Sequence, residues 1–244
     1  LQEHNPKKDE ASDAQILFMV INASSVTLIP ITIFMYRAQM GATRPTEVFI
    51  PILLATSVST LTGFFMIAAK QRINLLDKTL IKWLGGFLLL IIGLSAGFYL
   101  ISPAQRLAVS SALGNIILML LLGSVIWISL KHKVKCYEAF VDGAKEGFSV
   151  ALRIMPYLVA MLVAVGVFRA SGILDALVGG IKFLCAKIGL DGQFADALPT
   201  AFMKPLSGSG ARAMMIETMQ NFGADSFAAF TASVIQGSTE TTFY

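Results

Sequence analysis

Residues Trp83 to Gln105 read WLGGFLLLIIGLSAGFYLISPAQ and contain no Asp, Glu, Lys or Arg. A helix needs roughly 20 apolar residues to cross the hydrocarbon core of a bilayer, and this stretch exceeds that length. The same holds for three other stretches: Ala14 to Tyr36, Val48 to Ala69 and Leu107 to Leu130. All four are too long and too uniformly apolar for barrel strands. The sequence therefore predicts an all-α fold, a polytopic transmembrane helical protein.

The composition points the same way, since 55% of the 244 residues are hydrophobic and 14% are charged, against about 25% charged in soluble domains. The net charge of +4 comes from basic residues spread between the apolar runs, so we expect the lipid bilayer as a partner and no nucleic acid. Cys136 and Cys185 lie far apart, and His4 and His132 fall outside the spans. We therefore expect no enzyme activity, metal site or cofactor.

Basic residues in the loops predict the orientation. They gather after the second and fourth spans, at Lys70, Arg72, Lys78 and Lys82 and at Lys131, Lys133, Lys135 and Lys145. Loops rich in Lys and Arg face the cytoplasm, which places the N-terminal tail inside and the loop from Arg37 to Glu47 outside. Because the chain begins at Leu1 and ends at Tyr244 inside an apolar run, we expect it to be a piece of a longer protein.

The rest of the chain predicts four further segments. Charged and apolar residues alternate at helical spacing from Lys135 to Phe148, which indicates an amphipathic helix at the membrane surface. A fifth span covers Ile154 to Phe168, extended upstream if Arg153 reaches the headgroups. The stretch from Ile173 to Leu190 predicts an interfacial helix broken at its paired glycines, and the sixth span begins at Ser226.

Polar side chains interrupt the first span, where Asn22, Ser24, Ser25 and Thr27 precede Pro30. Proline lacks an N–H and clashes with the preceding helical turn, so this position favours a kink or an unwound stretch. Interrupted helices of this kind build substrate sites in secondary transporters. The alternative is that the hydroxyls pack between helices as structural hydrogen-bonding groups.

A second polar cluster, formed by Gln236, Ser238, Thr239 and Glu240, interrupts the last span. Aligned from Val20 and Val234, the two read VINASSVTLIP and VIQGSTETTFY and match mainly at their polar positions. Under the predicted topology they cross in opposite directions, which predicts an inverted repeat with broken helices. Glu240 is a candidate to bind a cation, a proton or a substrate. An ion pair with Lys204 or Arg212 is its alternative role.

Between the fifth and sixth spans, Leu198 to Met219 reads LPTAFMKPLSGSGARAMMIETM. Two half-helices around a flexible turn at Ser207, Gly208, Ser209 and Gly210 would make a re-entrant hairpin whose backbone lines a cavity. An ordinary extramembrane loop is the alternative.

The chain resembles the spore maturation protein A and B membrane proteins, which carry the nucleoside recognition or "Gate" domain. The stretches that carry the resemblance are INASSVTLIP, YEAFVDGAKEGF, RIMPYLVAMLVAVGVFRASG, KPLSGSGAR and QGSTETTFY. It implies an A-type half over residues 1–130 and a B-type Gate half over residues 131–244, in a bacterial inner membrane. It also implies that the hairpin and the two polar clusters face a ligand.

Two functional hypotheses follow from the residues and the resemblance. The first is a transporter-like protein that binds or carries a small polar solute, such as a nucleoside, with Na⁺ or H⁺ coupling. The second is a non-transporting scaffold that forms a homo-oligomer or holds a cell-envelope partner, with the polar clusters as packing groups.

Overall fold

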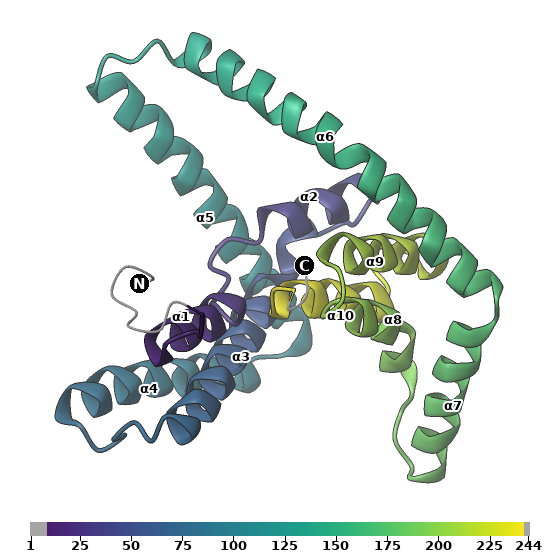
Figure 1. The fold of residues 1–244 in the computed structure, drawn as a ribbon. Coiled ribbons are helices and arrows are strands. Elements are labelled where there is room, and N and C mark those ends of the chain that lie inside the picture. Colours follow the sequence, from purple (N-terminus) through teal and green to yellow (C-terminus); the bar gives the residue numbers. More distant parts are fainter. Residues whose placement is uncertain (1–8, 242–244) are drawn as a thin grey trace.

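The computed structural model describes residues 9–241, apart from six side chains between 154 and 169. All regular secondary structure in this range is helical, and none of these residues forms a strand. The α-helices are α1 (Asp13–Ala23), α2 (Ile31–Gln39), α3 (Phe49–Lys70), α4 (Lys78–Leu100), α5 (Pro103–Lys131), α6 (Cys136–Ala170), α7 (Ile173–Lys187), α8 (Leu198–Met203), α9 (Gly208–Phe222) and α10 (Phe227–Ser238). Two short 3-10 helices, η2 (Pro45–Val48) and η3 (Gln193–Ala197), precede α3 and α8 (Figure 1).

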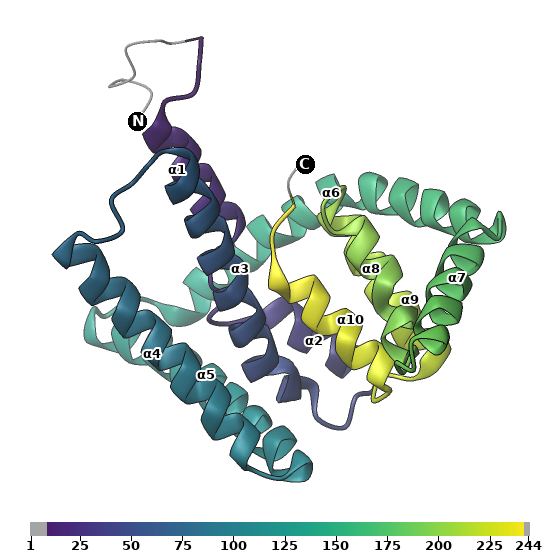
Figure 2. The same cartoon turned by 90° about the horizontal axis from the view of Figure 1, so that it is seen from below.

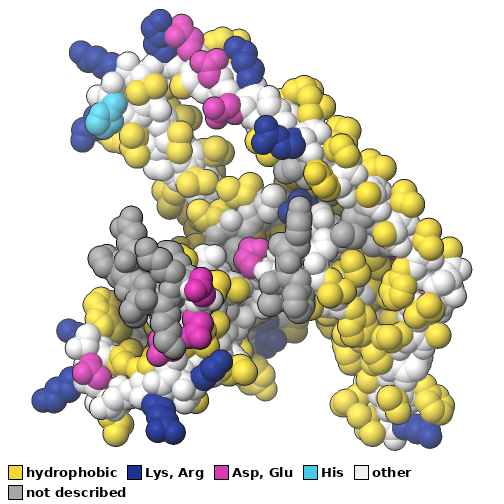
Figure 3. All heavy atoms as spheres, in the orientation of Figure 1, with side chains coloured by type: hydrophobic (Ala, Val, Ile, Leu, Met, Phe, Trp, Pro, Cys, Tyr) yellow, Lys and Arg dark blue, Asp and Glu magenta, His cyan; other side chains and the backbone are white. Residues whose placement is uncertain are grey.

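Helices α3, α4 and α5 are long and apolar enough to cross a membrane, which confirms the second, third and fourth predicted spans. Asp77 begins α4 by accepting the N–H groups of Thr79 and Leu80, and Ser102 caps α5. Residues 103–105, expected at the end of the third span, therefore open the next helix. Charged side chains gather at the α3–α4 and α5–α6 turns, while the helix flanks are hydrophobic (Figure 3). The chain is an all-α polytopic membrane protein.

The first charge-free stretch is two short helices rather than one crossing helix. Helix α1 ends at Ala23 and α2 begins after Pro30, so the predicted interruption is present and longer than a kink. Hydroxyl groups of α3 bind the backbone groups that the break frees. Thr56 Oγ1 accepts the N–H of Thr27 at 3.2 Å, and Thr60 Oγ1 donates to the carbonyl oxygen of Ser24. These side chains make the unwound segment tolerable in a water-poor environment.

Two predicted boundaries are wrong. The amphipathic segment and the fifth span form one continuous helix, α6, of 35 residues, with Pro156 inside it. Helix α7 likewise runs through Gly179 and Gly180 without a break. A glycine in a helix costs only about 1 kcal/mol relative to alanine, so it weakens a helix without ending it.

The hairpin between residues 198 and 219 is present, with a different turn. Helix α8 packs against the second half of α9, since Pro199 lies beside Met214 and Thr218. The turn consists of residues 204–207, whereas Gly208, the first residue of the predicted flexible tip, begins α9. The reason is Ser207, whose Oγ accepts the N–H of Gly210 at 3.1 Å and so caps the helix.

The core lies where α2, η2, α3, α9 and α10 pack together (Figure 2). Its buried side chains include Ile33, Phe34, Val48, Phe49, Ile52, Met215, Met219 and Ala232. Arg37 and Glu47 bound a predicted external loop, yet both side chains are buried beside this core. Arg37 Nη2 donates to Glu47 Oε1 at 2.6 Å, and Nη1 donates to Ser233 Oγ at 3.4 Å. This pair ties α2, η2 and α10 together and leaves only a short connection exposed.

Candidate functional site at the ends of α1 and α10

The two polar clusters meet in space. The backbone N–H of Glu240 donates to the carbonyl oxygen of Ala23 at 3.0 Å. Thr27 Oγ1 donates to the carbonyl oxygen of Gly237 at 3.3 Å. Ala23 and Gly237 occupy equivalent positions in the aligned segments. The carbonyl at the end of α1 thus accepts a hydrogen bond from the segment after α10. The carbonyl near the end of α10 accepts one from the segment after α1.

Helices α1 and α10 reach this meeting point from opposite directions. Helix α1 runs antiparallel to α3, because the carbonyl of Asp13 binds Gln71 Nε2 while Ser24 lies against Thr60. Helix α10 starts near the beginning of α3 and ends near its middle, where Glu240 and Ser59 line the same cavity. Two similar segments, opposite in direction and joined at their helix ends, have the geometry of the predicted inverted repeat.

The close approach of α10 to α2 and α3 depends on Gly237. A Cβ atom at this position would lie 2.8 Å from Ile52 Cγ2 and 2.9 Å from Ile33 Cδ1. Both distances are well inside van der Waals contact. The glycine therefore lets the end of α10 pack directly onto the interrupted first helix.

A cavity of about 610 Å³ opens where the helix ends and the hairpin turn converge. Its lining includes four of the predicted site residues: Ser24, Ser238, Thr239 and Glu240. The hairpin turn adds Lys204, and α3 adds Ser59. The lining thus combines a mostly apolar surface, which includes Val20, Pro205 and Ile235, with a few hydroxyl groups, one carboxylate and one ammonium group. The space has the size that small-molecule ligands occupy.

Lys204 gives the cavity its main buried charge. Its side chain is 5% exposed, and it is attracted by the carboxylate of Glu240 and repelled by Arg212. The C-terminal ends of α1 and α10 border the same cavity. Helix C-termini carry partial negative charge, so they favour a cation such as this ammonium group. The sequence identified Lys204 only as a structural partner for Glu240, whereas the structure makes it part of the lining.

The four predicted tip residues of the hairpin do not line the cavity, unlike Lys204 in the turn before them. Gln236 Nε2 donates to the carbonyl oxygen of Gly208 at 3.4 Å, and Ser207 Oγ lies 3.1 Å from Ser209 Oγ. None of Ser207, Gly208, Ser209 and Gly210 is part of the lining. Their contacts fix the position of the α9 start against α10.

The remaining predicted residues lie elsewhere. The side chains of Asn22 and Ser25 are exposed and do not line the cavity, and Thr27 bonds α10 and α3 as described above. Sequence reasoning missed Ser59 and its neighbours. A signal existed, since Thr56, Ser59 and Thr60 repeat at helical spacing inside an otherwise apolar span. Within residues 9–241, His, Cys, Asp and Glu form no cluster of three that could hold a metal ion.

The fold and the cavity define an all-α membrane protein in which the C-terminal ends of α1 and α10 meet beside a cavity with polar lining residues. Spore maturation protein B of Bacillus subtilis (strain 168) is 43% identical to this chain over 126 residues, which cover 52% of the chain and 68% of that protein. Spore maturation protein A of the same organism is 36% identical over 59 residues, 24% of the chain and 30% of that protein. The chain therefore belongs to the spore maturation protein A/B family. No family model matches it, and no solved structure shows significant similarity.

Proposed function

We propose that this protein binds a small polar solute in the cavity between α1, α10 and the hairpin turn, and carries it across the bacterial inner membrane. The observation that supports the proposal most strongly is the Glu240–Ala23 hydrogen bond, because it joins two helix ends that arrive from opposite directions. In secondary transporters, interrupted helices of inverted repeats form the substrate site, and access alternates as one repeat moves against the other.

The lining indicates a solute with both donors and acceptors. The hydroxyl groups of Ser59 and Thr239 can donate or accept, whereas that of Ser24 donates to the carbonyl oxygen of Val20 and can only accept. Lys204 donates, and Glu240 accepts when ionised. A nucleoside fits this chemistry through its ribose hydroxyls and base edge, and the cavity of about 610 Å³ has room for it. The family resemblance makes nucleosides the first solutes to test.

Glu240 is the proposed coupling residue. It follows α10 and lies beside the C-terminal carbonyl groups of α1. Carbonyl groups and carboxylates of this kind bind Na⁺, and a carboxylate can also accept a proton. Lys204 offsets its charge when no ion is bound. Binding of a cation to Glu240 would weaken this pair and free the Lys204 ammonium for the solute.

Thermal unfolding in detergent tests the binding step. The purified full-length protein is screened against nucleosides, nucleobases, amino sugars and small peptides at varied Na⁺ and pH. A ligand at about 100 times its Kd stabilises the folded state by about 2.7 kcal/mol, a rise of about 5 °C or more in the unfolding midpoint. We expect one solute class to give this rise and Glu240→Gln to lose it.

The matched control is Glu138→Gln, because this exposed carboxylate on α6 pairs with Lys135 at the surface and lies outside the cavity. It should keep the full rise. The competing role is that of a scaffold, in which the polar clusters are packing groups. In that case Glu240→Gln lowers the unfolding midpoint in the absence of any solute, and no solute raises the midpoint of the parent protein. We then expect an envelope protein to copurify with it.

A further inference from the structure

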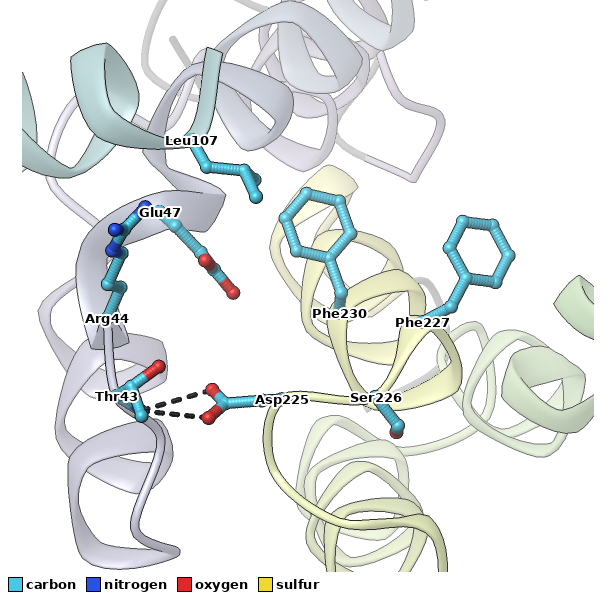
Figure 4. A pocket seen from close by; sticks show the side chains of 8 residues that line it. All are labelled: Thr43, Arg44, Glu47, Leu107, Asp225, Ser226, Phe227 and Phe230. Carbon is cyan, nitrogen blue, oxygen red and sulfur yellow. Dashed lines mark hydrogen bonds between the residues drawn. The ribbon is translucent and has the colours of Figure 1, made fainter. Parts of the chain in front are cut away.

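A second cavity of about 570 Å³ lies at the other end of α10. Helix α10 has 12 residues, which separates its two ends by about 18 Å at 1.5 Å per residue. The second cavity is lined by Thr43, Arg44, Glu47, Leu107, Asp225, Ser226, Phe227 and Phe230 (Figure 4). It shares no lining residue with the cavity at Glu240. Its chemistry can therefore be considered independently of the transport proposal.

Two carboxylates face this second cavity. Both Asp225 oxygens accept the N–H of Thr43, at 3.1 and 3.2 Å, and this holds the exposed carboxylate at the rim. Glu47 extends into the space between Arg44 and Phe230 (Figure 4). Its Oε1 binds Arg37, which attracts the Glu47 charge more strongly than Asp225 repels it. A small cation beside the exposed Asp225 carboxylate would relieve the repulsion that remains.

The buried guanidinium of Arg37 cannot supply that cation at the cavity side. Arg37 is fully buried behind Glu47 and approaches it from the α2 side. Arg44 is exposed on the cavity wall and attracts Glu47 electrostatically. The wall thus presents one accessible cation beside two carboxylates, and a planar guanidinium is well suited to bind a carboxylate group of a ligand.

The remaining wall is apolar. Phe230 and Phe227 extend from successive turns of α10, and the Phe230 ring points towards Leu107 (Figure 4). Phe227 is 55% exposed. Phe230 and Leu107 lie beside the charged groups, whereas the Phe227 ring lies beyond Phe230 (Figure 4). An aliphatic or aromatic ligand side chain would cover the surface of Phe230 and Leu107.

We propose that this cavity binds a zwitterionic α-amino acid with an apolar side chain. Asp225 and Glu47 hold the ammonium group, Arg44 holds the carboxylate group, and Phe230 and Leu107 pack on the side chain. This arrangement matches both signs of charge and the apolar wall with one ligand. A purely cationic or purely anionic solute would leave one of the charged groups without a partner.

Binding of leucine and three analogues to the purified full-length protein, measured by isothermal titration calorimetry in detergent, tests the proposal. Leucinamide lacks the carboxylate, 4-methylpentanoate lacks the ammonium group, and glycine lacks the apolar side chain. We expect leucine to bind at least about 10-fold more tightly than each of the three, since one lost ionic or apolar contact is worth about 1.4 kcal/mol or more.

Two variants separate the ionic contacts. Arg44→Gln should weaken leucine binding about 10-fold and leave leucinamide binding unchanged. Asp225→Asn should weaken both leucine and leucinamide, while its amide oxygen still accepts the N–H of Thr43 and preserves the fold. Arg72→Gln and Asp142→Asn, both at exposed positions outside the cavity, are the matched controls and should bind as the parent does.

The proposal is overturned if leucine at 10 mM produces no binding heat in the parent protein. It is equally overturned if leucine binds with an affinity that neither Arg44→Gln nor Asp225→Asn changes. Neither result bears on Glu240, whose cavity is tested with a different variant and a different solute panel.

Discussion

The backbone N–H of Glu240 lies 3.0 Å from the carbonyl oxygen of Ala23. This contact joins residues that are far apart in the sequence, and it brings the C-terminal end of α1 onto the C-terminal end of α10. Both segments have similar polar sequences, and they reach the contact in opposite directions along α3. The candidate site depends on this contact between the two helix ends.

Cysteines at the two positions should form a disulfide bond. In a background with Cys136→Ser and Cys185→Ser, the pair Ala23→Cys and Glu240→Cys places two thiols on backbones joined by a hydrogen bond, within the separation that a disulfide spans. Mass spectrometry of the oxidised, non-reduced protein should recover the linked peptides. Glu138→Cys in place of Glu240→Cys, on the exposed face of α6, should give no link to position 23. Equal yields for both pairs would contradict the contact.

The hydroxyl of Thr56 should stabilise the break in the first span. It accepts the N–H of Thr27 at 3.2 Å while also bonding its own helix. Thr56→Val keeps the shape but leaves that N–H without an acceptor, which we expect to cost about 1–3 kcal/mol of unfolding free energy. Thr62→Val is the control, because the exposed Thr62 hydroxyl bonds only its own helix, at Val58. A similar small loss in both variants, by denaturant titration in detergent, would argue against this role.

Gly237 should not tolerate a side chain. Its Cβ would meet Ile52 Cγ2 at 2.8 Å, and overpacking of this kind costs about 1–3 kcal/mol. Gly180→Ala, where a Cβ meets open space on α7, should cost nothing and can gain from the better helix propensity of alanine. The two unfolding midpoints, measured side by side, check the prediction. A Gly237→Ala protein as stable as the parent would show that α10 packs less closely than described.

Part of this arrangement could be predicted from the sequence. Pro30 and the hydroxyls before it predicted the break after Ala23, and the likeness of the two polar segments predicted that they pair in opposite directions. Which side chains would face the cavity depended on the rotation of α1 about its axis. Periodicity does not determine that rotation: Ser24 lines the cavity and Asn22 is exposed.

Other features depended on contacts between distant parts of the chain. The Arg37–Glu47 ion pair is buried because α10 packs against it, with Ser233 bonded to Arg37. The sequence places both residues at the edges of a predicted loop and does not indicate that a distant helix packs there. The second cavity combines the Thr43–Arg44 connection with the α9–α10 turn, and no motif links the two. The continuity of α6 was missed because its change from amphipathic to apolar composition was interpreted as a boundary, although no residue there ends a helix.

The native cysteines provide a test of orientation. Cys136 is exposed at the start of α6, after the lysine-rich loop that we predict to be cytoplasmic, and Cys185 is buried. In a Cys185→Ser background, a membrane-impermeant maleimide should leave Cys136 unlabelled in intact cells and label it after permeabilisation. Full labelling in intact cells would place this loop outside and reverse the predicted topology.

Solute uptake into proteoliposomes is the most direct test of the central claim that the Glu240 cavity serves transport. Vesicles containing the full-length protein are given tritiated uridine or adenosine, with an inward Na⁺ or H⁺ gradient. We predict gradient-dependent uptake above that of empty vesicles, reduced at least 10-fold by Glu240→Gln and unchanged by Glu138→Gln. Uptake equal to that of empty vesicles for both nucleosides, or uptake that Glu240→Gln leaves intact, would contradict the account.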